Sequence, residues 1–401
     1  MRYLTKIELF FTFSPTKVKI CFMIRRKFWL DRIKKCWESV PIVWLSGVRR
    51  VGKTTLVQEI ENALYLNCDL PSVKRLLEDP EFFFESVTKP IVIFDEIHQL
   101  ADPSALLKIG ADAYGHLKII ATGSSTLAAT QKFSDSLTGR KRSVHLVPIL
   151  STELNDFGIK DITQRLLRGG LPPALLSEEF DFEFYSEWID SFFSRDIQEL
   201  FNIEKRAGFL RLLEYLIKEN GGLIEFNTLS KYAGLSIPTV NNYLQMLETT
   251  HAVYCLRPFH GGGKREMLKQ PKYYAFDTGF VSYYNGWQNL RNEDCGLLLE
   301  NLVLETLQSL PFIDKIYFWR DKEKREIDFV CPRRDGSIDT IECKWNAECF
   351  NTKTLAIFRE SYPKGNNFVV SSQVSTSYRK RFGEREVTFT SIYELGKRIS
   401  L

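Results

Sequence analysis

The stretch that decides the fold is IVWLSGVRRVGKTT, residues 42–55. Its opening run, IVWLS, is typical of a buried strand, and the sequence after Thr55 has the composition of a helix. Between the two lies the pattern G-x-x-x-x-G-K-T, whose glycines let backbone N–H groups curl around phosphate oxygens. Because the pattern stands between a strand and a helix, it predicts a phosphate-binding loop and argues against a chance glycine-rich turn.

The loop predicts which residues bind a nucleotide and its metal ion. Lys53 is expected to reach the β- and γ-phosphates, and the hydroxyl of Thr54 is expected to bind Mg²⁺. We expect the nucleotide to be ATP. The residues predicted to surround its phosphates are Gly47, Val48, Arg49, Arg50, Val51, Gly52, Lys53, Thr54 and Thr55.

A second apolar run, IVIFDEIHQL (residues 91–100), carries two carboxylates after its apolar part. A strand that is apolar throughout is typical of a parallel sheet buried on both faces. Ligands of such sheets bind outside the carboxyl ends of the strands, so Asp95 and Glu96 are expected beside the loop. We predict that Asp95 binds Mg²⁺ through water and that Glu96 orients the water that attacks the phosphate.

Three further apolar runs complete a sheet. They are ALYLNCD (63–69), LKIIATGSS (117–125) and SVHLVPIL (143–150). Helical sequence separates the runs, so strands and helices alternate along the chain. The predicted fold class is therefore α/β, with a mostly parallel sheet between helices.

Composition limits the class of protein further. The 401 residues exceed one ordinary core, so two or three domains are expected. The net charge of +4 permits nucleic-acid binding without arguing for it. Eight cysteines without a C-x-x-C pair predict free thiols and a cytoplasmic location, and the apolar runs are too short for a membrane span. Residues 1–22 are predicted to be an extension outside the fold, as a misassigned start would produce.

From about residue 25 to 200 the chain resembles the AAA+-type ATPases of bacteria and archaea that carry a C-terminal domain of uncharacterised function. The resemblance rests on GVRRVGKTT, IVIFDEIHQL, ATGSS, SLTGRKRSVHLVPILSTEL and RGGLPPALL, in that order. It implies an ATPase core over residues 23–150 and a helical lid over residues 151–205. The segment RGGLPPALL (168–176) is then expected to close over the nucleotide, although an ordinary turn between helices would have a similar sequence.

The same resemblance implies two further catalytic groups. The polar end of the fourth strand acts as a phosphate sensor in this family, and Ser124 is the best match here, with Thr122 second. Arg140 stands where these proteins place an arginine finger, a group worth about 10³–10⁵ in rate. Since such fingers act across a subunit boundary, a homo-oligomer is implied. The alternative for Arg140 is a surface arginine in the basic run TGRKR.

Residues 206–285 resemble a winged helix-turn-helix. Three helical patterns precede two apolar runs that would form the wing, at 206–219, 227–234, 236–250, 252–259 and 272–277. The third helix and the wing would present to DNA the side chains of Thr239, Asn241, Asn242, Gln245, Lys264 and Arg265. The third helix carries no lysine or arginine, however, and phosphate neutralisation dominates affinity for DNA. A structural or inter-subunit role therefore stays open beside DNA binding.

The C-terminal module, residues 286–401, contains a hairpin whose register follows from its sequence. The hairpin is EIDFVCPRRDGSIDTIECKW, residues 326–345. Side chains alternate between the two faces of a strand. A three-residue loop over residues 334–336, with Gly336 left-handed, is the arrangement that separates polar from apolar side chains.

This register has a chemical consequence. It places Asp328 opposite Glu342 and Glu326 opposite Lys344. Like charges so placed, roughly 4.5–5.5 Å apart, destabilise a sheet, so the two carboxylates suit a shared divalent cation, Mg²⁺ or Mn²⁺. Lys344 would lie on the same face and stabilise charge that develops in a transition state.

Asp328 followed by Glu342-x-Lys344 is also the pattern of the PD-(D/E)xK nuclease fold, which this α/β module resembles. In that family a preceding helix supplies a further glutamate, and Glu300 in LLLEN matches it. The resemblance implies that Glu300, Asp328 and Glu342 bind metal and that Lys344 is catalytic. The alternative is a solvated cluster of ion pairs.

The leading hypothesis from the sequence is an ATP-hydrolysing AAA+-type protein whose nucleotide cycle gates a nuclease-like domain. That domain would act on nucleic acid, with DNA as the partner. The alternative is a slow ATP-dependent switch or scaffold that uses a catalytically inactive nuclease-like domain to bind partners.

Overall fold

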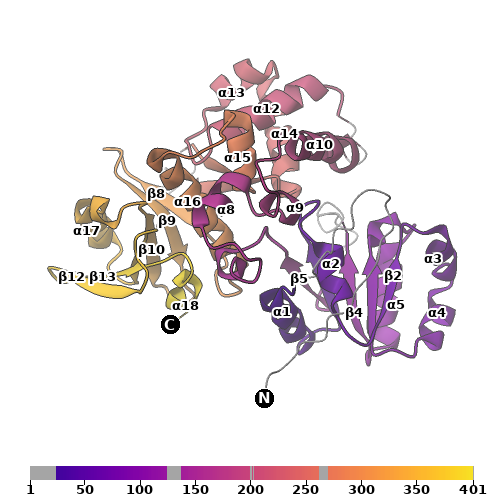
Figure 1. The fold of residues 1–401 in the computed structure, drawn as a ribbon. Coiled ribbons are helices and arrows are strands. Elements are labelled where there is room, and N and C mark those ends of the chain that lie inside the picture. The colour runs from indigo at the N-terminus through magenta and orange to yellow at the C-terminus, as the bar shows by residue number, and fades with distance from the viewer. Residues whose placement is uncertain (1–23, 124–136, 199–200, 202, 262–269, 401) are drawn as a thin grey trace.

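The computed structural model describes residues 24–123, 137–198, 201, 203–261 and 270–400. Its N-terminal part is a five-stranded sheet in the order β2-β3-β4-β1-β5, in which every neighbouring pair is parallel. The strands are β1 (Ile42–Ser46), β2 (Ala63–Asn67), β3 (Ile91–Asp95), β4 (Lys118–Thr122) and β5 (Lys141–His145). Helices cover both faces (Figure 1). The predicted α/β fold class is thereby confirmed.

The two faces of this sheet bury different helices. Val43 and Leu45 pack with Trp29 of the first helix, whereas Trp44 packs with Phe84 from the other side. Adjacent residues of β1 thus face opposite layers, which explains why the strand is apolar throughout. The helices of this region are α1 (Lys27–Trp37), α2 (Lys53–Gln58), α3 (Pro71–Leu76), α4 (Pro80–Ser86), η1 (Ile97–Gln99) and α5 (Pro103–Ala113).

The chain leaves the sheet earlier than the sequence predicted. β5 ends at His145 rather than at residue 150, and Pro148 lacks the N–H that a longer ladder would need. The region predicted as a lid is helical and comprises η2 (Ser151–Glu153), α8 (Ile162–Arg168), α9 (Pro172–Leu175), α10 (Phe182–Ser191) and the π-helix η3 (Phe192–Gln198).

The connector has the predicted order of three helices and two strands. The elements are α12 (Arg206–Lys218), α13 (Phe226–Ala233), α14 (Ile237–Thr249), β6 (Val253–Pro258) and β7 (Lys272–Ala275). Ser236 caps α14, since its hydroxyl accepts a hydrogen bond from Thr239 N at 3.4 Å. β6 and β7 are antiparallel.

The C-terminal sheet includes these two strands. Its order is β12-β13-β11-β10-β9-β8-β6-β7, and β6 pairs in parallel with β8 through Arg257–Tyr317 and Pro258–Phe318. The predicted wing and the C-terminal module therefore share one sheet, although the predicted boundary at residue 285 separated them. The remaining elements are α15 (Thr278–Asn285), α16 (Asn292–Ser309), β8 (Tyr317–Arg320), β9 (Glu326–Pro332), β10 (Ile338–Cys343), η5 (Ala347–Cys349), α17 (Thr352–Ser361), β11 (Asn367–Val370), β12 (Tyr378–Phe382), β13 (Arg385–Thr390) and α18 (Leu395–Ile399).

Within the described residues we find neither a membrane-spanning helix nor a disulfide bond. The helices in this part of the chain are all too short or too polar to cross a membrane. The seven cysteines within it are free thiols.

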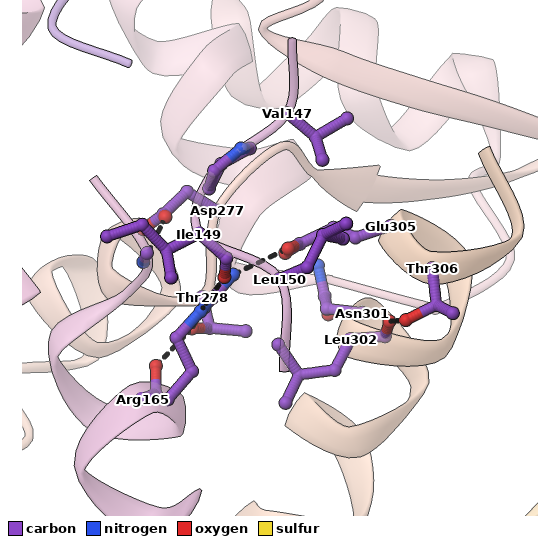
Figure 2. A network of polar contacts seen from close by, with 12 residues as sticks. Val147, Ile149, Leu150, Arg165, Asp277, Thr278, Asn301, Leu302, Glu305 and Thr306 are labelled. Carbon is purple, nitrogen blue, oxygen red and sulfur yellow. Dashed lines mark hydrogen bonds and ion pairs between the residues drawn. The ribbon is translucent and has the colours of Figure 1, made fainter. Parts of the chain in front are cut away.

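A buried polar network joins the N-terminal sheet to the C-terminal region (Figure 2). Arg165 of α8 is fully buried and pairs with Glu305 of α16, with 2.5 Å between a guanidinium nitrogen and Oε2. The guanidinium also donates to Ile149 O at 2.9 Å and to Thr278 Oγ1 at 3.1 Å. These residues come from the segment after β5, from α8, from the start of α15 and from α16. A single side chain therefore ties four segments together.

Gly169 lets the chain pass close to this network. Its φ is +70°, and a Cβ built on it would lie 1.9 Å from Asp277 Oδ1. We expect Gly169→Ala to lower the free energy of unfolding by at least about 2 kcal/mol, because the methyl group overlaps a buried carboxylate and the backbone, with ψ of −173°, has a conformation nearly restricted to glycine. Urea denaturation followed by circular dichroism measures this loss.

Gly158→Ala is the matched control for that prediction. Gly158 also has a positive φ, of +73°, but no atom lies within 4 Å of its added Cβ. Its substitution should therefore lower the free energy of unfolding only by the cost of the backbone conformation, about 1–2 kcal/mol. Equal losses in the two variants would contradict a steric role for Gly169.

Candidate functional site

The predicted phosphate-binding loop lies between β1 and α2. Gly52, which precedes α2, has a φ of +98°, a conformation that favours glycine. Lys53 follows it, and its Nζ donates to Gly47 O at 2.8 Å and to Val48 O at 3.2 Å. Burial lowers the pKa of Lys53, and the charges of Glu96 and Asp196 act in the opposite direction. The lysine amine is thus sheltered inside the loop.

Asp95, at the end of β3, accepts hydrogen bonds from three hydroxyl groups. Thr54 Oγ1 donates to its Oδ2 at 2.8 Å, and Tyr65 OH donates to the same oxygen at 2.7 Å. Thr122 Oγ1 donates to Oδ1. Since Mg²⁺ in nucleotide sites is held by few protein oxygens plus substrate phosphates, the adjacent oxygens of Thr54 and Asp95 fit such an ion.

Glu96 is held in an uncommon backbone conformation. Its φ is +54°, in the left-handed region that residues with side chains seldom adopt, and such strain clusters at functional sites. Its N–H donates to Thr122 Oγ1 at 3.0 Å, and its carboxylate lies 3.2 Å from His98 Nδ1. The side chain is 32% exposed and therefore partly accessible to solvent.

Thr122 and Ser124 were the two predicted sensors. Thr122, the second choice, contacts both Asp95 and Glu96, whereas Ser124 lies outside the described residues. The lid segment reaches the loop, because Pro172 Cγ is 3.9 Å from a Cβ built on Gly52. The expected position of this segment over the nucleotide is therefore compatible with the fold.

Arg140 lies away from the loop of its own chain. It precedes β5, and its backbone carbonyl accepts from Ile42 N at the start of β1. The loop follows Ser46 at the other end of β1, roughly 13 Å away at ~3.3 Å per residue. The guanidinium pairs with Asp112, its Nε donating to Oδ1 at 2.5 Å. An action on the nucleotide of the same chain is thus ruled out by distance, and an action across a subunit boundary stays a prediction.

The hairpin has the predicted register over residues 329–332 and 338–341, and the predicted pair of Asp328 opposite Glu342 lies beyond the last paired residues. Phe329 pairs with Ile341 and Pro332 with Ile338. Arg333 N donates to Ser337 O at 2.8 Å, which closes the three-residue loop, and Gly336 has the expected left-handed φ of +82°. The face of Phe329 and Ile341 is apolar and buried, as predicted.

On the side away from the hairpin loop, the paired residues end at Phe329 and Ile341. The polar residues Asp328, Glu342 and Lys344 lie just beyond this point. Asp328 Oδ2 accepts a hydrogen bond from Cys343 N at 2.7 Å. Lys344 Nζ lies 2.8 Å from Glu342 Oε2 and 3.4 Å from Asp328 Oδ2. Asp328 and Glu342 are 7% and 6% exposed, so this is a buried cluster rather than a solvated one.

One contact predicted for the hairpin is wrong. Glu326 was expected opposite Lys344, but it pairs with Lys272 of β7 and with Arg320, whose NH1 lies 3.0 Å from Oε2. The reason is that β8 pairs with β9 and supplies Arg320, whereas Lys272 reaches the carboxylate from β7, which β8 and β6 separate from β9 in the sheet. Lys272 is only 4% exposed, and a lysine in the aromatic run KYYAF was the signal that could have revealed it.

Glu300 approaches the same cluster from α16. Tyr274 OH donates to its Oε2 at 2.8 Å. Burial, followed by the charge of Asp328, raises the pKa of Glu300 and of Glu342. Within the described residues no group of three or more His, Cys, Asp or Glu side chains is arranged to hold a metal ion. As they lie, the carboxylates do not fit a metal, because the Lys344 amine occupies the place between Asp328 and Glu342.

The third helix of the connector presents polar side chains outward. Asn241, Asn242 and Gln245 are exposed, and Thr239 is half-buried. Lys264 and Arg265 lie outside the described residues. DNA contact by this helix stays a prediction.

Three family models match consecutive parts of the chain. Residues 39–155 match a family described as AAA domain. Residues 159–291 and 295–394 match two families described as domains of unknown function, DUF8612 and DUF4143. The first of these two spans the predicted boundary between lid and connector at residue 205.

Relatives are found across much of the chain. An uncharacterized protein of Mycobacterium tuberculosis is 27% identical over 325 residues, covering 79% of this chain and 73% of the relative. An uncharacterized protein of Haemophilus influenzae is 24% identical over 351 residues, covering 78% and 85%.

Solved structures overlap more loosely. CDC6P from Pyrobaculum aerophilum is 14% identical, with a TM-score of 0.29 over 72% of this chain and 97% of that one. AMPPCP-bound DnaA from Aquifex aeolicus is 10% identical, with a TM-score of 0.25 over 55% and 85%. Both overlaps are too loose to carry an argument. The match to the family described as AAA domain covers the predicted phosphate-binding loop and Asp95, so this part of the chain is similar to that family.

Proposed function

We propose that this chain binds and hydrolyses ATP at the carboxyl end of its N-terminal sheet. The observation that carries the proposal is that Thr54 and Thr122 both donate to Asp95, beside the loop that shelters the Lys53 amine. Lys53 would bind the phosphates, and Thr54 with Asp95 would hold the Mg²⁺ that neutralises phosphate charge. The direct test is phosphate release by the full-length protein with ATP and Mg²⁺; a folded protein that binds no ATP overturns the proposal.

Glu96 is assigned the orientation of the attacking water. Its carboxylate is partly exposed, and its backbone N–H donates to Thr122 Oγ1, which fixes the backbone. Ser124 remains the proposed sensor. Arg140 is the proposed finger for a neighbouring subunit, and its exposed guanidinium would have to exchange Asp112 for a phosphate. On this proposal the active form is a homo-oligomer.

The nucleotide state would reach the C-terminal sheet through the lid. Pro172 adjoins Gly52 of the loop, and Arg165 of the preceding helix pairs with Glu305 of α16. The same helix carries Glu300 toward the carboxylate cluster. A shift of the lid would thus be felt at α16, because a buried ion pair resists separation.

Cleavage of nucleic acid is a second candidate function. The observation that favours it is that Lys344 lies within 3.4 Å of both Asp328 and Glu342. The carboxylates as they lie do not fit a metal, so a partner-binding role for an inactive domain remains the alternative.

A nuclease assay separates these two roles. With DNA or RNA, Mg²⁺ or Mn²⁺, and ATP present or absent, cleavage is expected to fall about a hundredfold in Asp328→Asn and Lys344→Met proteins, since both remove charge from the reacting centre. Asp335→Asn is the matched control, because Asp335 lies in the exposed hairpin loop. Cleavage that survives both substitutions would come from a contaminant, and no cleavage of any substrate favours the binding role.

A further inference from the structure

The tip of the phosphate-binding loop is held by acidic side chains of the lid. Arg49 Nε pairs with Asp196 Oδ2, and Arg50 lies 3.2 Å from Glu187 Oε2. Trp188 Nε1 also donates to Arg49 O at 3.1 Å. The Asp196 side chain is 15% exposed and that of Glu187 is 58% exposed. The Arg49–Asp196 pair therefore matters more, because exposed ion pairs contribute little.

Asp196 lies among the cations of the nucleotide site. Burial raises the pKa of its carboxyl, and the charges of Arg49, Lys53 and His98 act in the opposite direction. Asp196 is carried by the π-helix η3, a rare form of helix that is frequent at functional sites. A lid carboxylate thus faces the loop that is proposed to receive phosphate.

The phosphates of ATP would compete with this carboxylate. Arg49 and Lys53 attract either group, while two negative groups at short range in a sheltered site repel one another. Bound phosphate and the Arg49–Asp196 pair therefore oppose each other, and one of them must yield.

We propose that Asp196 is an acidic latch, a positioning residue that holds Arg49 against the lid until the phosphates of ATP displace it. Nucleotide binding then frees the loop tip from η3. The inference rests on the proposed function, because it requires ATP to occupy the loop. The inference therefore assigns to the nucleotide site a carboxylate, Asp196, that opposes ATP binding, in addition to the groups that favour it.

Trp188 connects the Arg49–Asp196 pair to aromatic residues near the C-terminal sheet. Trp188 contacts Arg49 with its indole N–H, and its ring lies 5.0 Å from the ring of Phe276 and 4.7 Å from that of Phe280. Phe276 follows β7, and Phe280 belongs to α15. Release of Arg49 would therefore alter the packing of the segment between the C-terminal sheet and α16.

Calorimetric titration of the full-length protein with ATP and Mg²⁺ tests the latch. Asp196→Asn is expected to bind ATP about tenfold more tightly, since one competing charge is removed. Its affinity for adenosine, which has no phosphate, is expected not to change. Asp196→Glu keeps the charge and should stay near wild type. Asp190→Asn is the matched control, because Asp190 forms an exposed pair with Arg206 on the preceding helix α10.

A double substitution assigns the effect to Arg49. In an Arg49→Gln background the gain from Asp196→Asn is expected to fall to about twofold or less, because the pair is already broken. Should Asp196→Asn fail to fold, Asp196→Ser carries the same test with the same expected direction.

The outcomes separate the latch from the function on which it rests. An Asp196→Asn protein with unchanged or weaker ATP affinity overturns the latch and leaves ATP binding intact. Equal tightening for ATP and adenosine also overturns it, because a purely structural effect would not depend on phosphate. A wild-type protein that binds no ATP overturns the proposed function and the latch together.

Discussion

A Glu96→Gln protein is expected to bind ATP as the wild type does and to hydrolyse it about 10²–10⁴-fold more slowly, the range for loss of a catalytic acid or base. Glutamine keeps the shape of the side chain but cannot accept a proton from the attacking water. The backbone of residue 96 is held by Thr122 Oγ1, so the substitution leaves the strand in place. Phosphate release at saturating ATP measures the rate, and calorimetric titration measures the affinity.

Glu61→Gln is the control for this prediction. Glu61 is exposed and follows α2, so the same chemical change occurs near the loop without facing it. Its rate should equal that of the wild type. Hydrolysis by the Glu96→Gln protein at the wild-type rate would show that another group orients the water, and His98, 3.2 Å from the Glu96 carboxylate, would be the next residue to substitute.

Replacing Arg165 by methionine is expected to destabilise the chain by about 3–5 kcal/mol, the usual result of removing one partner of a buried ion pair. Glu305 would be left buried, 1% exposed, without its ion-pair partner. The carbonyl of Ile149 would lose its donor at 2.9 Å. Urea denaturation of the full-length protein, followed by circular dichroism, measures the free energy of unfolding.

A second substitution tests whether the unpartnered buried carboxyl group of Glu305 causes this loss. Arg165→Met combined with Glu305→Leu should recover a large part of it, because apolar residues of similar volume are tolerated where a buried pair was. Arg142→Met is the control, since Arg142 is exposed on β5 and should change stability by less than about 0.5 kcal/mol. A double variant no more stable than Arg165→Met would mean that the lost contacts to Ile149 O and Thr278 Oγ1 dominate over the unpartnered carboxyl group.

The nucleotide site was predictable because its signals are local. Gly52, Lys53 and Thr54 are consecutive, and Asp95 ends a run that is visibly a buried strand. Parallel pairing of β1, β4 and β3 then brings Asp95 to Thr54. What the sequence could not supply was Tyr65, whose hydroxyl reaches Asp95 from β2, because β2 pairs with β3 only in the folded sheet.

The hairpin shows where such reasoning ends. Alternation and the left-handed Gly336 predict the pairing of Phe329 with Ile341 correctly. They do not predict that the strands part at Asp328, nor that Glu326 turns to Lys272. Both outcomes depend on the folded sheet, in which β7 is separated from β9 by two strands and by about fifty residues of sequence.

The sequence by itself determined the loop, the alternation of strands and helices and the register of the hairpin, because each is set by residue spacing and turn geometry over a few positions. Only the tertiary structure decided which distant groups meet. It joined β6 to β8, placed Asp196 against Arg49 and paired Arg165 with Glu305. The physical reason is that a buried charge requires a partner wherever the fold supplies one, and the identity of that partner is a property of the packed chain rather than of any short segment.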